Sequence, residues 1–294
     1  MKKTCFILAA VAVLASCQKN ASPVQEPADE LLPVRLSMGV ETKVSDTEFD
    51  EGDQVAIYMV NYVNDAPGTL QTSGNHYDCH QFTLGEVWSS AEQMYWLDKT
   101  TKADFYCFYP YAVPADVNAY SFQTAADQSG LAAYKASDFV WGKASGVAPS
   151  KYNVDIATNH ILSNAKIIVR PGDGFTEETL AAAEVKVRIN DVLTEALIDI
   201  ADGSVTATGA PADVVPYDYG EYYRAVVVPQ TVAEGSELIV LTVNGVDYAL
   251  KKGFTFRPGV RHKFTVTVNK TSGGINIGVG DWEDDEEDNG GSAE

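Results

Sequence analysis

The segment Glu237-Leu238-Ile239-Val240-Leu241-Thr242-Val243-Asn244-Gly245-Val246-Asp247-Tyr248-Ala249-Leu250 is typical of a β-hairpin. Residues 237–243 and 246–250 are rich in the β-branched and aromatic side chains that strands favour. Between them stands Asn244-Gly245, a pair preferred in type I′ turns because both central positions need a positive φ. The sequence therefore predicts two antiparallel strands joined by a two-residue turn.

Similar apolar or alternating runs recur through most of the chain, and turn-forming residues separate them. Segment 176–183 is the one convincing helix, and 112–137 is expected to be mostly irregular. Short strands with frequent turns are typical of β-sandwiches, so we expect an all-β protein with a sandwich in each half and one short helix. The other expected strands are 33–40, 54–60, 80–84, 93–97, 103–109, 152–156, 165–169, 183–189, 193–200, 222–229 and 262–268.

The N-terminus has the pattern of a secretory signal peptide. Lys2-Lys3 precedes an apolar run of about ten residues, which is too short to span a bilayer. The run ends in Leu14-Ala15-Ser16-Cys17, which looks like a bacterial lipobox with lipid attachment at Cys17. Residues 1–16 are then removed. The alternative is an ordinary signal peptide that happens to contain a cysteine.

The remaining chain divides by composition. Residues 17–32 are small, polar and Pro-rich, as in a linker. A Gly-, Ala-, Pro- and Ser-containing loop at 143–151 is the expected border between domains at 33–150 and 151–270. In the terminal segment 271–294, an alternating apolar run precedes residues 281–288, which hold seven acids among eight and are typical of a disordered tail.

The charge of the chain limits its partners. The formal net charge is −20, and removing the signal peptide would take away two lysines and no acids. A chain this acidic repels nucleic acid and anionic lipid headgroups. We therefore expect no nucleic-acid partner, and we expect the acyl chain rather than charge to hold the protein at a membrane.

We find no catalytic or cofactor-binding motif, so neither an enzyme nor a cofactor is expected. His76, Asp78 and His80 could share a face and hold a metal, although a polar loop with turn hydrogen bonds explains them more simply. The acidic tail could bind Ca²⁺ loosely, but it lacks the spacing of a shaped calcium loop. Export makes a Cys79–Cys107 disulfide an open alternative to two free thiols.

Several motifs in order carry a resemblance to a known family. They are Tyr223-Arg224-Ala225-Val226-Val227-Val228-Pro229-Gln230-Thr231-Val232, Phe49 with Gly52-Asp53 and Tyr58, Phe108-Tyr109-Pro110-Tyr111, Asp127-Gln128-Ser129 with Ser137-Asp138-Phe139-Val140-Trp141, Asn159-His160-Ile161-Leu162-Ser163, and Ile277 to Trp282. Together they resemble the fimbrillins, the subunits of type V pili of Bacteroidales, and in particular the fimbrillin-like group. Asn159 and the acidic tail depart from the family pattern.

The resemblance implies two tandem transthyretin-like β-sandwiches, exported as a lipoprotein to the surface of the outer membrane and built into a fimbrium. It also implies assembly by strand exchange, in which a protease removes the first strand and a strand of a neighbouring subunit fills the groove. The implied partners are other fimbrillin subunits, the outer membrane through the lipid, and a host protein or glycan receptor.

These implications fall on particular residues. Val34, Leu36 and Met38 are the apolar side of the strand to be displaced. Lys43 is the favoured cleavage residue and Arg35 the second, unless the subunit stays lipidated as an anchor and is not cut. The candidates for a donor strand, which could equally be the last strand of their own domain, are Ile275, Ile277 and Val279.

A different function remains open from the sequence. The chain could be a monomeric outer-membrane surface lipoprotein that binds glycans, since exposed Tyr or Trp side chains stack on sugars. Most of its aromatic residues, however, lie in strand patterns such as 105–109 and are expected in the core. The ordered motifs therefore favour the pilus subunit.

Overall fold

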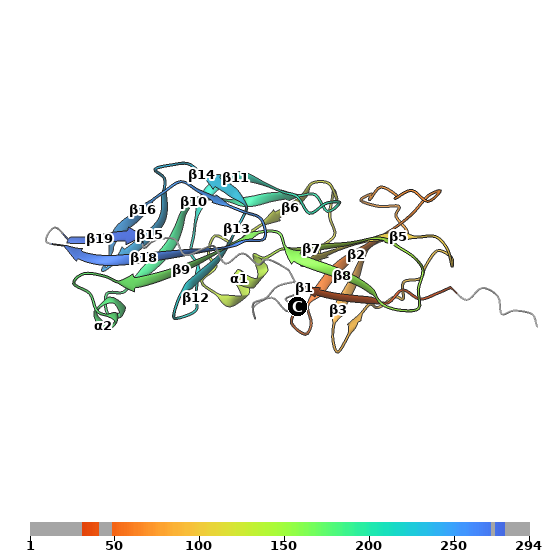
Figure 1. Ribbon diagram of the computed structural model, residues 1–294, viewed down its shortest axis with the longest axis horizontal. Coiled ribbons are helices and arrows are strands. Elements are labelled where there is room, and N and C mark those ends of the chain that lie inside the picture. Colours follow the sequence, from red (N-terminus) through yellow and green to blue (C-terminus); the bar gives the residue numbers. More distant parts are fainter. Residues whose placement is uncertain (1–30, 41–48, 272–273, 280–294) are drawn as a thin grey trace, which may run out of the picture. The chain divides into compact units, whose positions relative to one another are not determined.

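The computed structural model describes residues 31–40, 49–271 and 274–279 (Figure 1). The expected signal peptide, Cys17, most of the linker, Lys43 and the acidic tail lie outside these residues. The described chain consists mainly of short strands, with two short helices. The predicted all-β class is therefore confirmed.

A seven-stranded sheet holds most of the strands of the N-terminal half (Figure 1). β1 lies at one edge and runs parallel to β8, whereas the other neighbours in this sheet are antiparallel. In spatial order the strands are β1 (Leu36–Val40), β8 (Val154–His160), β7 (Val140–Val147), β5 (Ala103–Tyr109), β2 (Gln54–Asn61), β3 (Tyr77–Leu84) and β4 (Trp88–Ser89).

Two five-stranded sheets make up most of the remainder. One contains β11 (Val205–Val214), β10 (Lys186–Ile198), β15 (Glu237–Val243) and β16 (Val246–Lys251), with β6 (Tyr120–Gln123) also pairing to β10. The other contains β12 (Tyr217–Asp218), β13 (Tyr223–Val227), β9 (Ser163–Pro171), β18 (Arg261–Thr271) and β19 (Gly274–Val279). A two-stranded sheet pairs β14 (Gln230–Val232) with β17 (Phe254–Phe256).

The two five-stranded sheets share one hydrophobic core. Ile189 and Leu241 from the first sheet and Ile167 and Phe264 from the second belong to the same buried cluster. Each of these side chains is at most 4% exposed. Apolar side chains from two sheets that meet in one core define a β-sandwich, as predicted for this half of the chain.

The hairpin predicted from 237–250 is confirmed. β15 and β16 pair antiparallel up to Val243 opposite Val246. Asn244 and Gly245 have φ values of 50° and 81°, as a type I′ turn requires. The Asn244 N–H also donates to the Ala183 carbonyl, so the turn is tied to the segment that precedes β10.

The expectation of a single helix is wrong. The predicted helix is present as α2 (Glu177–Ala181), with Thr176 and Thr179 forming a reciprocal capping box. A second helix, α1 (Leu131–Ala136), lies in the stretch expected to be irregular. It has one buried side chain, Tyr134, and no side-chain N-cap, so the sequence carries little local signal for it.

Other segments also differ from expectation. The strands expected at 183–189 and 193–200 form one long strand, β10, whose pairing to β11 has bulges near residues 190 and 194. Segment 93–97 forms a bridge at Tyr95 rather than a strand, and part of the loop expected at 143–151 belongs to β7. These differences arise because long-range pairing, which is not visible locally, decides where a strand ends.

The expected domain border at 150/151 falls between β7 and β8, which pair with each other through Val140 and His160. From the N-terminal side of that border, β6 pairs with β10 through Tyr120 opposite Ile198. Strand pairing therefore crosses the border, and because β6 belongs to the β10 sheet, no single position divides the chain by sheets. The two-domain organisation stays a prediction.

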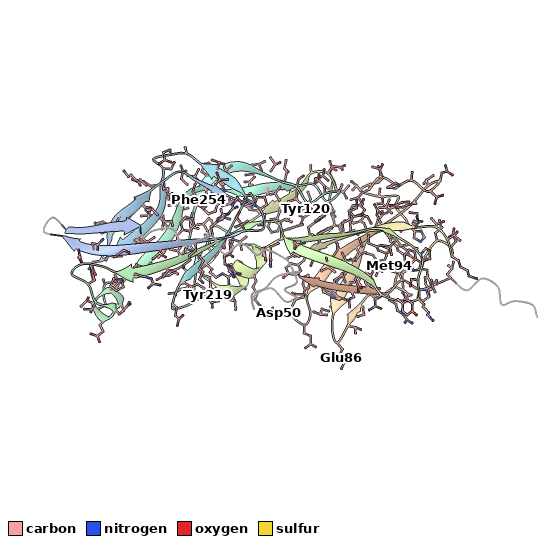
Figure 2. The ribbon with its side chains drawn as sticks, in the orientation of Figure 1. Asp50, Glu86, Met94, Tyr120, Tyr219 and Phe254 are labelled. Atoms are coloured by element: carbon pink, nitrogen blue, oxygen red, sulfur yellow. The ribbon has the colours of Figure 1, made fainter. Side chains whose placement is uncertain are left out.

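A further buried cluster joins residues from both sides of that border. Gln128, fully buried, accepts a hydrogen bond from the Val226 N–H and donates one to the Val226 carbonyl. The Trp141 indole N–H donates to the Ile200 carbonyl. Tyr120, labelled in Figure 2, packs against Phe108 and Phe139 of the same cluster.

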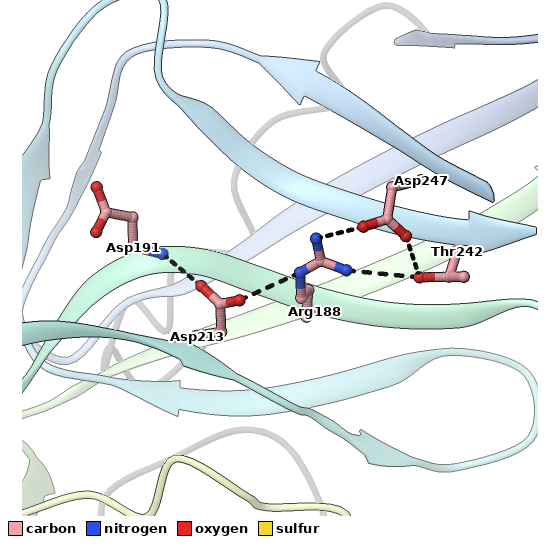
Figure 3. A network of polar contacts seen from close by, with 5 residues as sticks. All are labelled: Arg188, Asp191, Asp213, Thr242 and Asp247. Carbon is pink, nitrogen blue, oxygen red and sulfur yellow. Dashed lines mark hydrogen bonds and ion pairs between the residues drawn. The ribbon is translucent and has the colours of Figure 1, made fainter. Parts of the chain in front are cut away.

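A polar network crosses the outer face of the β10 sheet (Figure 3). Arg188 on β10 contacts Asp247 on β16 at 2.7 Å and Asp213 on β11 at 3.3 Å. Thr242 on β15 donates to Asp247 and Asp213 accepts from the backbone N–H of Asp191. This network links four neighbouring strands, and the Arg188 bond lowers the pKa of the Asp247 carboxyl.

Candidate functional site

The first described segment changes its pairing partner half-way along its length. The Val34 N–H donates to the Met94 carbonyl, and the Trp96 N–H donates to the Leu32 carbonyl. From Leu36 onward the segment pairs with β8 instead, in a parallel register that sets Leu36 opposite Val154. Residues 32–40 therefore fill a slot between the 94–96 segment and β8.

The side chains of this segment alternate between core and surface. Val34, Leu36 and Met38 are 2%, 6% and 8% exposed. The side chains between them, Arg35 and Ser37, are exposed and half-buried respectively. The apolar face expected from the sequence is therefore the buried one. Its displacement during assembly is a separate prediction.

The core beneath these three side chains is formed by residues of the seven-stranded sheet and of segment 94–96. Full burial of a side chain of this size contributes about 1.5–3 kcal/mol, so the segment is held by several kcal/mol of apolar burial. Met94, labelled in Figure 2, is one of these core residues. The buried residues that share this core are Val55, Ile57, Met59, Phe82, Met94, Trp96, Ala103, Phe105, Cys107, Val154 and Ile156.

Three side chains hold the backbone of this segment by donating hydrogen bonds to its carbonyls. The Trp88 indole N–H donates to the Met38 carbonyl at 3.1 Å, and the Gln93 amide donates to the Val34 carbonyl at 2.9 Å. The Thr158 hydroxyl donates to the Gly39 carbonyl at 3.0 Å. Sequence reasoning missed all three, because they lie 50 to 119 residues away in the chain.

Of the two candidate cleavage residues, the structure describes Arg35 but not Lys43. Arg35 has an exposed side chain, but its carbonyl accepts a hydrogen bond from the Val154 N–H at 2.8 Å. Hydrolysis after Arg35 therefore requires this part of the segment to detach. Lys43 lies in 41–48, outside the described residues.

The candidate donor residues belong to β19, the edge strand next to β18. The antiparallel register sets Ile275, Ile277 and Val279 opposite Lys270, Val268 and Val266. This is the arrangement in which they form the last strand of their own sheet. An edge strand has one partner strand, so it can leave without breaking the pairing of any other strand.

The other candidate residues have local structural roles. His76 and His80 each place Nε2 within 2.9 Å of a backbone carbonyl, of Tyr95 and Glu92 respectively. Asp78 accepts from the N–H groups of Gly74 and Asn75. Among the described residues, no group of three His, Cys, Asp or Glu side chains is placed to hold a metal ion.

Cys79 and Cys107 do not form a disulfide. Both are free, and burial raises the pKa of the Cys79 thiol to about 11 and that of Cys107 further. Cys107 Sγ lies 3.5 Å from Met38 Sδ, in the core beneath the first strand. Both thiols are therefore protonated at neutral pH and chemically quiet.

In the part of the chain that the structure describes, no helix has the length and apolar character needed to cross a membrane.

Known proteins similar to this chain were found by family and by structure. Residues 42–282 match the model of the family described as fimbrillin-like. The chain belongs to the fimbrillin-like family. The resemblance that the sequence motifs carry is thereby confirmed, and the match extends from just after β1 to Trp282. A search of the curated proteins gave no match to this fimbrillin-like chain.

Solved structures share the fold at low identity. A proposed cell adhesion protein from Bacteroides uniformis is 24% identical, with a TM-score of 0.63 over 85% of this chain and 98% of that one. A second, from Bacteroides ovatus, is 13% identical, with a TM-score of 0.67 over 86% and 97%. A fimbrial protein from Bacteroides ovatus is 18% identical, with a TM-score of 0.52 over 84% of this chain and 50% of that one.

Proposed function

We propose that this chain is a subunit of a surface fimbrium or fimbrial adhesin, and that its first strand occupies the site that a strand of another subunit later fills. Family membership supports the pilus or adhesin role, a location at the cell surface and polymerisation with other pilus subunits. The described network of contacts around residues 32–40 supports the strand exchange. It is the single observation that carries the proposal.

Removal of residues 32–40 would leave a site that favours a new strand. The carbonyl of Met94 and the N–H of Trp96 would lose their partners, as would the N–H of Val154. The core beneath Val34, Leu36 and Met38 would be open to water. Unpaired backbone groups beside an apolar groove are a template for β-augmentation, in which main-chain bonds give affinity and alternate side chains give specificity.

The terminal segment has the pattern that such a groove requires. Ile275, Ile277 and Val279 alternate with Asn276, Gly278 and Gly280, just as Val34, Leu36 and Met38 alternate with smaller or polar residues. A β19 strand that leaves β18 would therefore offer three apolar side chains at the same spacing of two residues. Ser272-Gly273-Gly274, whose composition is typical of linkers, is the proposed hinge for this movement.

Export and release complete the proposal. The chain is exported as a lipoprotein with the acyl chain on Cys17 and is held at the outer membrane until a protease cuts after Lys43 or Arg35. A subunit that is not cut keeps its lipid and its first strand, and it then acts as the anchor of the fimbrium.

The deciding experiment is mass spectrometry of the N-terminus of surface-extracted protein, together with gel analysis of heat-resistant ladders. Chains that form ladders and begin after residue 43, or after residue 35 with residues 36–40 displaced from the groove, would support strand exchange. Ile277→Asp should abolish the ladders, whereas Asn276→Asp, on the opposite face of the strand, should keep them. A diacylated Cys17 as the sole species, no ladders and saturable retardation by a polysaccharide would instead favour a monomeric glycan-binding lipoprotein.

A further inference from the structure

The described chain begins at one end of the seven-stranded sheet, and three loops between strands lie at the same end. β2 ends at Asn61, which pairs with Ala103 at the start of β5, and Ala103 pairs with Val147 at the end of β7. Leu32, just after the first described residue, pairs with Trp96. Segments 31–35, 61–66, 95–102 and 148–153 therefore lie at this end, which we call the entry end (Figure 1).

The entry end carries many of the exposed apolar side chains of the molecule. Of the eleven exposed large hydrophobic residues in the described chain, five lie in these four segments. They are Leu31 (50% exposed), Val63 (66%), Tyr95 (37%), Leu97 (48%) and Tyr152 (71%). Scattered single residues of this kind are ordinary, but their concentration around the point of chain entry is not.

The same segments carry an excess of positive charge. They contain four cations, all with exposed side chains, and two acids, Asp65 and Asp98. Lys151 lies over the ring of its neighbour Tyr152, with Nζ 5.4 Å from the ring centroid. The four cations are Arg35, Lys99, Lys102 and Lys151. These four segments therefore carry two more cations than acids, in a chain whose net charge is −20.

We propose that the entry end is a membrane-facing surface, which rests against lipid headgroups while the chain is held by a lipid at Cys17. This inference rests on the lipid anchor of the proposed function. Tyr and Leu side chains partition into the headgroup region, and lysines place their amines among the phosphates while their stems stay apolar.

The length of the linker selects this end over other surfaces. Thirteen residues, 18–30, separate Cys17 from Leu31. A segment of this length has a root-mean-square span of roughly 20 Å as a random coil and reaches about 45 Å when fully extended. The entry end is therefore held close to the bilayer, at a high effective concentration, before any contact is made.

Charge explains why the contact needs the tether. The acidic chain as a whole is repelled by anionic lipids, but this repulsion is screened over about 8–10 Å in physiological salt. Once the lipid brings the entry end within that distance, the local cations and apolar side chains dominate. The contact is lost when a protease removes the first strand, because the tether leaves with it.

Quenching by brominated lipids tests the contact directly. The chain from Cys17 onward, with Cys79→Ser so that one accessible thiol remains, is coupled through Cys17 to a maleimide lipid in vesicles of phosphatidylcholine and phosphatidylglycerol. Tyr152→Trp supplies a reporter at the entry end, and Val246→Trp supplies one in the β15–β16 turn, where the side chain is 53% exposed. With brominated phosphatidylcholine, at least half of the added emission from Tyr152→Trp should be quenched, and that from Val246→Trp should be unchanged.

Two variants and one control complete the test. Leu97→Asp with Lys99→Glu should restore most of the Tyr152→Trp emission, because both side chains would oppose contact with the bilayer. Equal quenching at both reporters, or none at position 152, would overturn the proposal. So would a blue shift of the Tyr152→Trp emission that grows with protein concentration without vesicles, because that result identifies a second copy as the occupant. Chemical coupling makes the outcome independent of whether cells acylate Cys17, which mass spectrometry of the native N-terminus decides.

Discussion

The Trp88 indole N–H donates a hydrogen bond to the carbonyl of Met38, across 50 residues of sequence. The Trp88 ring meets that of Phe49 edge-on at 5.1 Å, and Phe49 packs on Tyr109 of β5 at 5.7 Å. Phe49 is the first described residue after 41–48. One aromatic group thus holds both the end of the first strand and the point where the described chain resumes.

Trp88→Phe should loosen the first strand without unfolding the molecule. Loss of one hydrogen bond of this kind costs about 1 kcal/mol, so the detached state should become roughly fivefold more populated. Cleavage by trypsin after Arg35 should accelerate by the same factor, since it requires detachment. The readout is the rate of appearance of a chain beginning at Leu36. Trp141→Phe, which removes an indole bond to Ile200 away from the strand, is the matched control; equal acceleration by both would contradict this role of Trp88.

Gln128→Met should destabilise the shared core more than Gln230→Met does. Gln128 is fully buried and bonds both the N–H and the carbonyl of Val226, and Gln230 makes the same pair of bonds to Leu193 while half-buried. Loss of the Gln128 amide leaves two buried backbone groups unpaired, at about 1–3 kcal/mol each. Water can replace the amide at Gln230. The urea midpoints of the two variants would measure both losses of stability. A smaller midpoint shift for Gln128→Met than for Gln230→Met would show that the N–H and carbonyl of Val226 find other partners.

The sequence was sufficient where structure is decided locally. The 237–250 hairpin, the α2 helix and strand 103–109 follow from turn chemistry, capping residues and β-propensity, and each is present. The buried face of the first strand follows from simple alternation of Val34, Leu36 and Met38. These signals need only neighbours in the chain, which a single sequence contains.

What the sequence did not reveal depends on distant partners. Helix α1 buries Tyr134, whose ring packs against that of Tyr217 in β12, and five strands separate the two residues in the sequence. The three side chains that hold the first strand, and the switch of its pairing from 94–96 to β8, join segments that no local pattern connects. The groove of the candidate site could therefore be placed from the sequence, but its polar contacts could not.

Asp247→Asn should lower stability at neutral pH and lose its effect in acid. The hydrogen bond from Arg188, followed by that from Thr242, lowers the pKa of the folded Asp247 carboxyl below the unfolded value of about 3.9. The stabilisation is therefore present above pH about 4 and is lost as the pH falls through the folded pKa. Urea midpoints of variant and wild type should differ at pH 7, and the difference should shrink as the pH is lowered below about 4. Asp191→Asn is the control, because Asp191 joins the network through its backbone N–H; a difference for Asp247→Asn that does not change with pH would contradict the ion pair.

Gly203→Ala should destabilise the protein more than Gly220→Ala, although both glycines have a positive φ, of 76° and 89°. Each substitution forces an L residue into the left-handed region, at a cost of about 1–2 kcal/mol. A Cβ at Gly203 would also lie 2.7 Å from two ring carbons of Trp141, whereas one at Gly220 would meet nothing within 4 Å. The Trp141 ring has little freedom to move away, because its indole N–H donates to the carbonyl of Ile200, three residues before Gly203. Overpacking of this kind adds about 1–3 kcal/mol, so thermal or urea unfolding should separate the two variants clearly. Equal losses of stability in the two variants would mean that the Trp141 ring moves aside. Trp141→Leu, which makes room for the methyl group, should reduce the effect of Gly203→Ala if the ring is the obstacle. It should leave that effect unchanged if the ring moves aside.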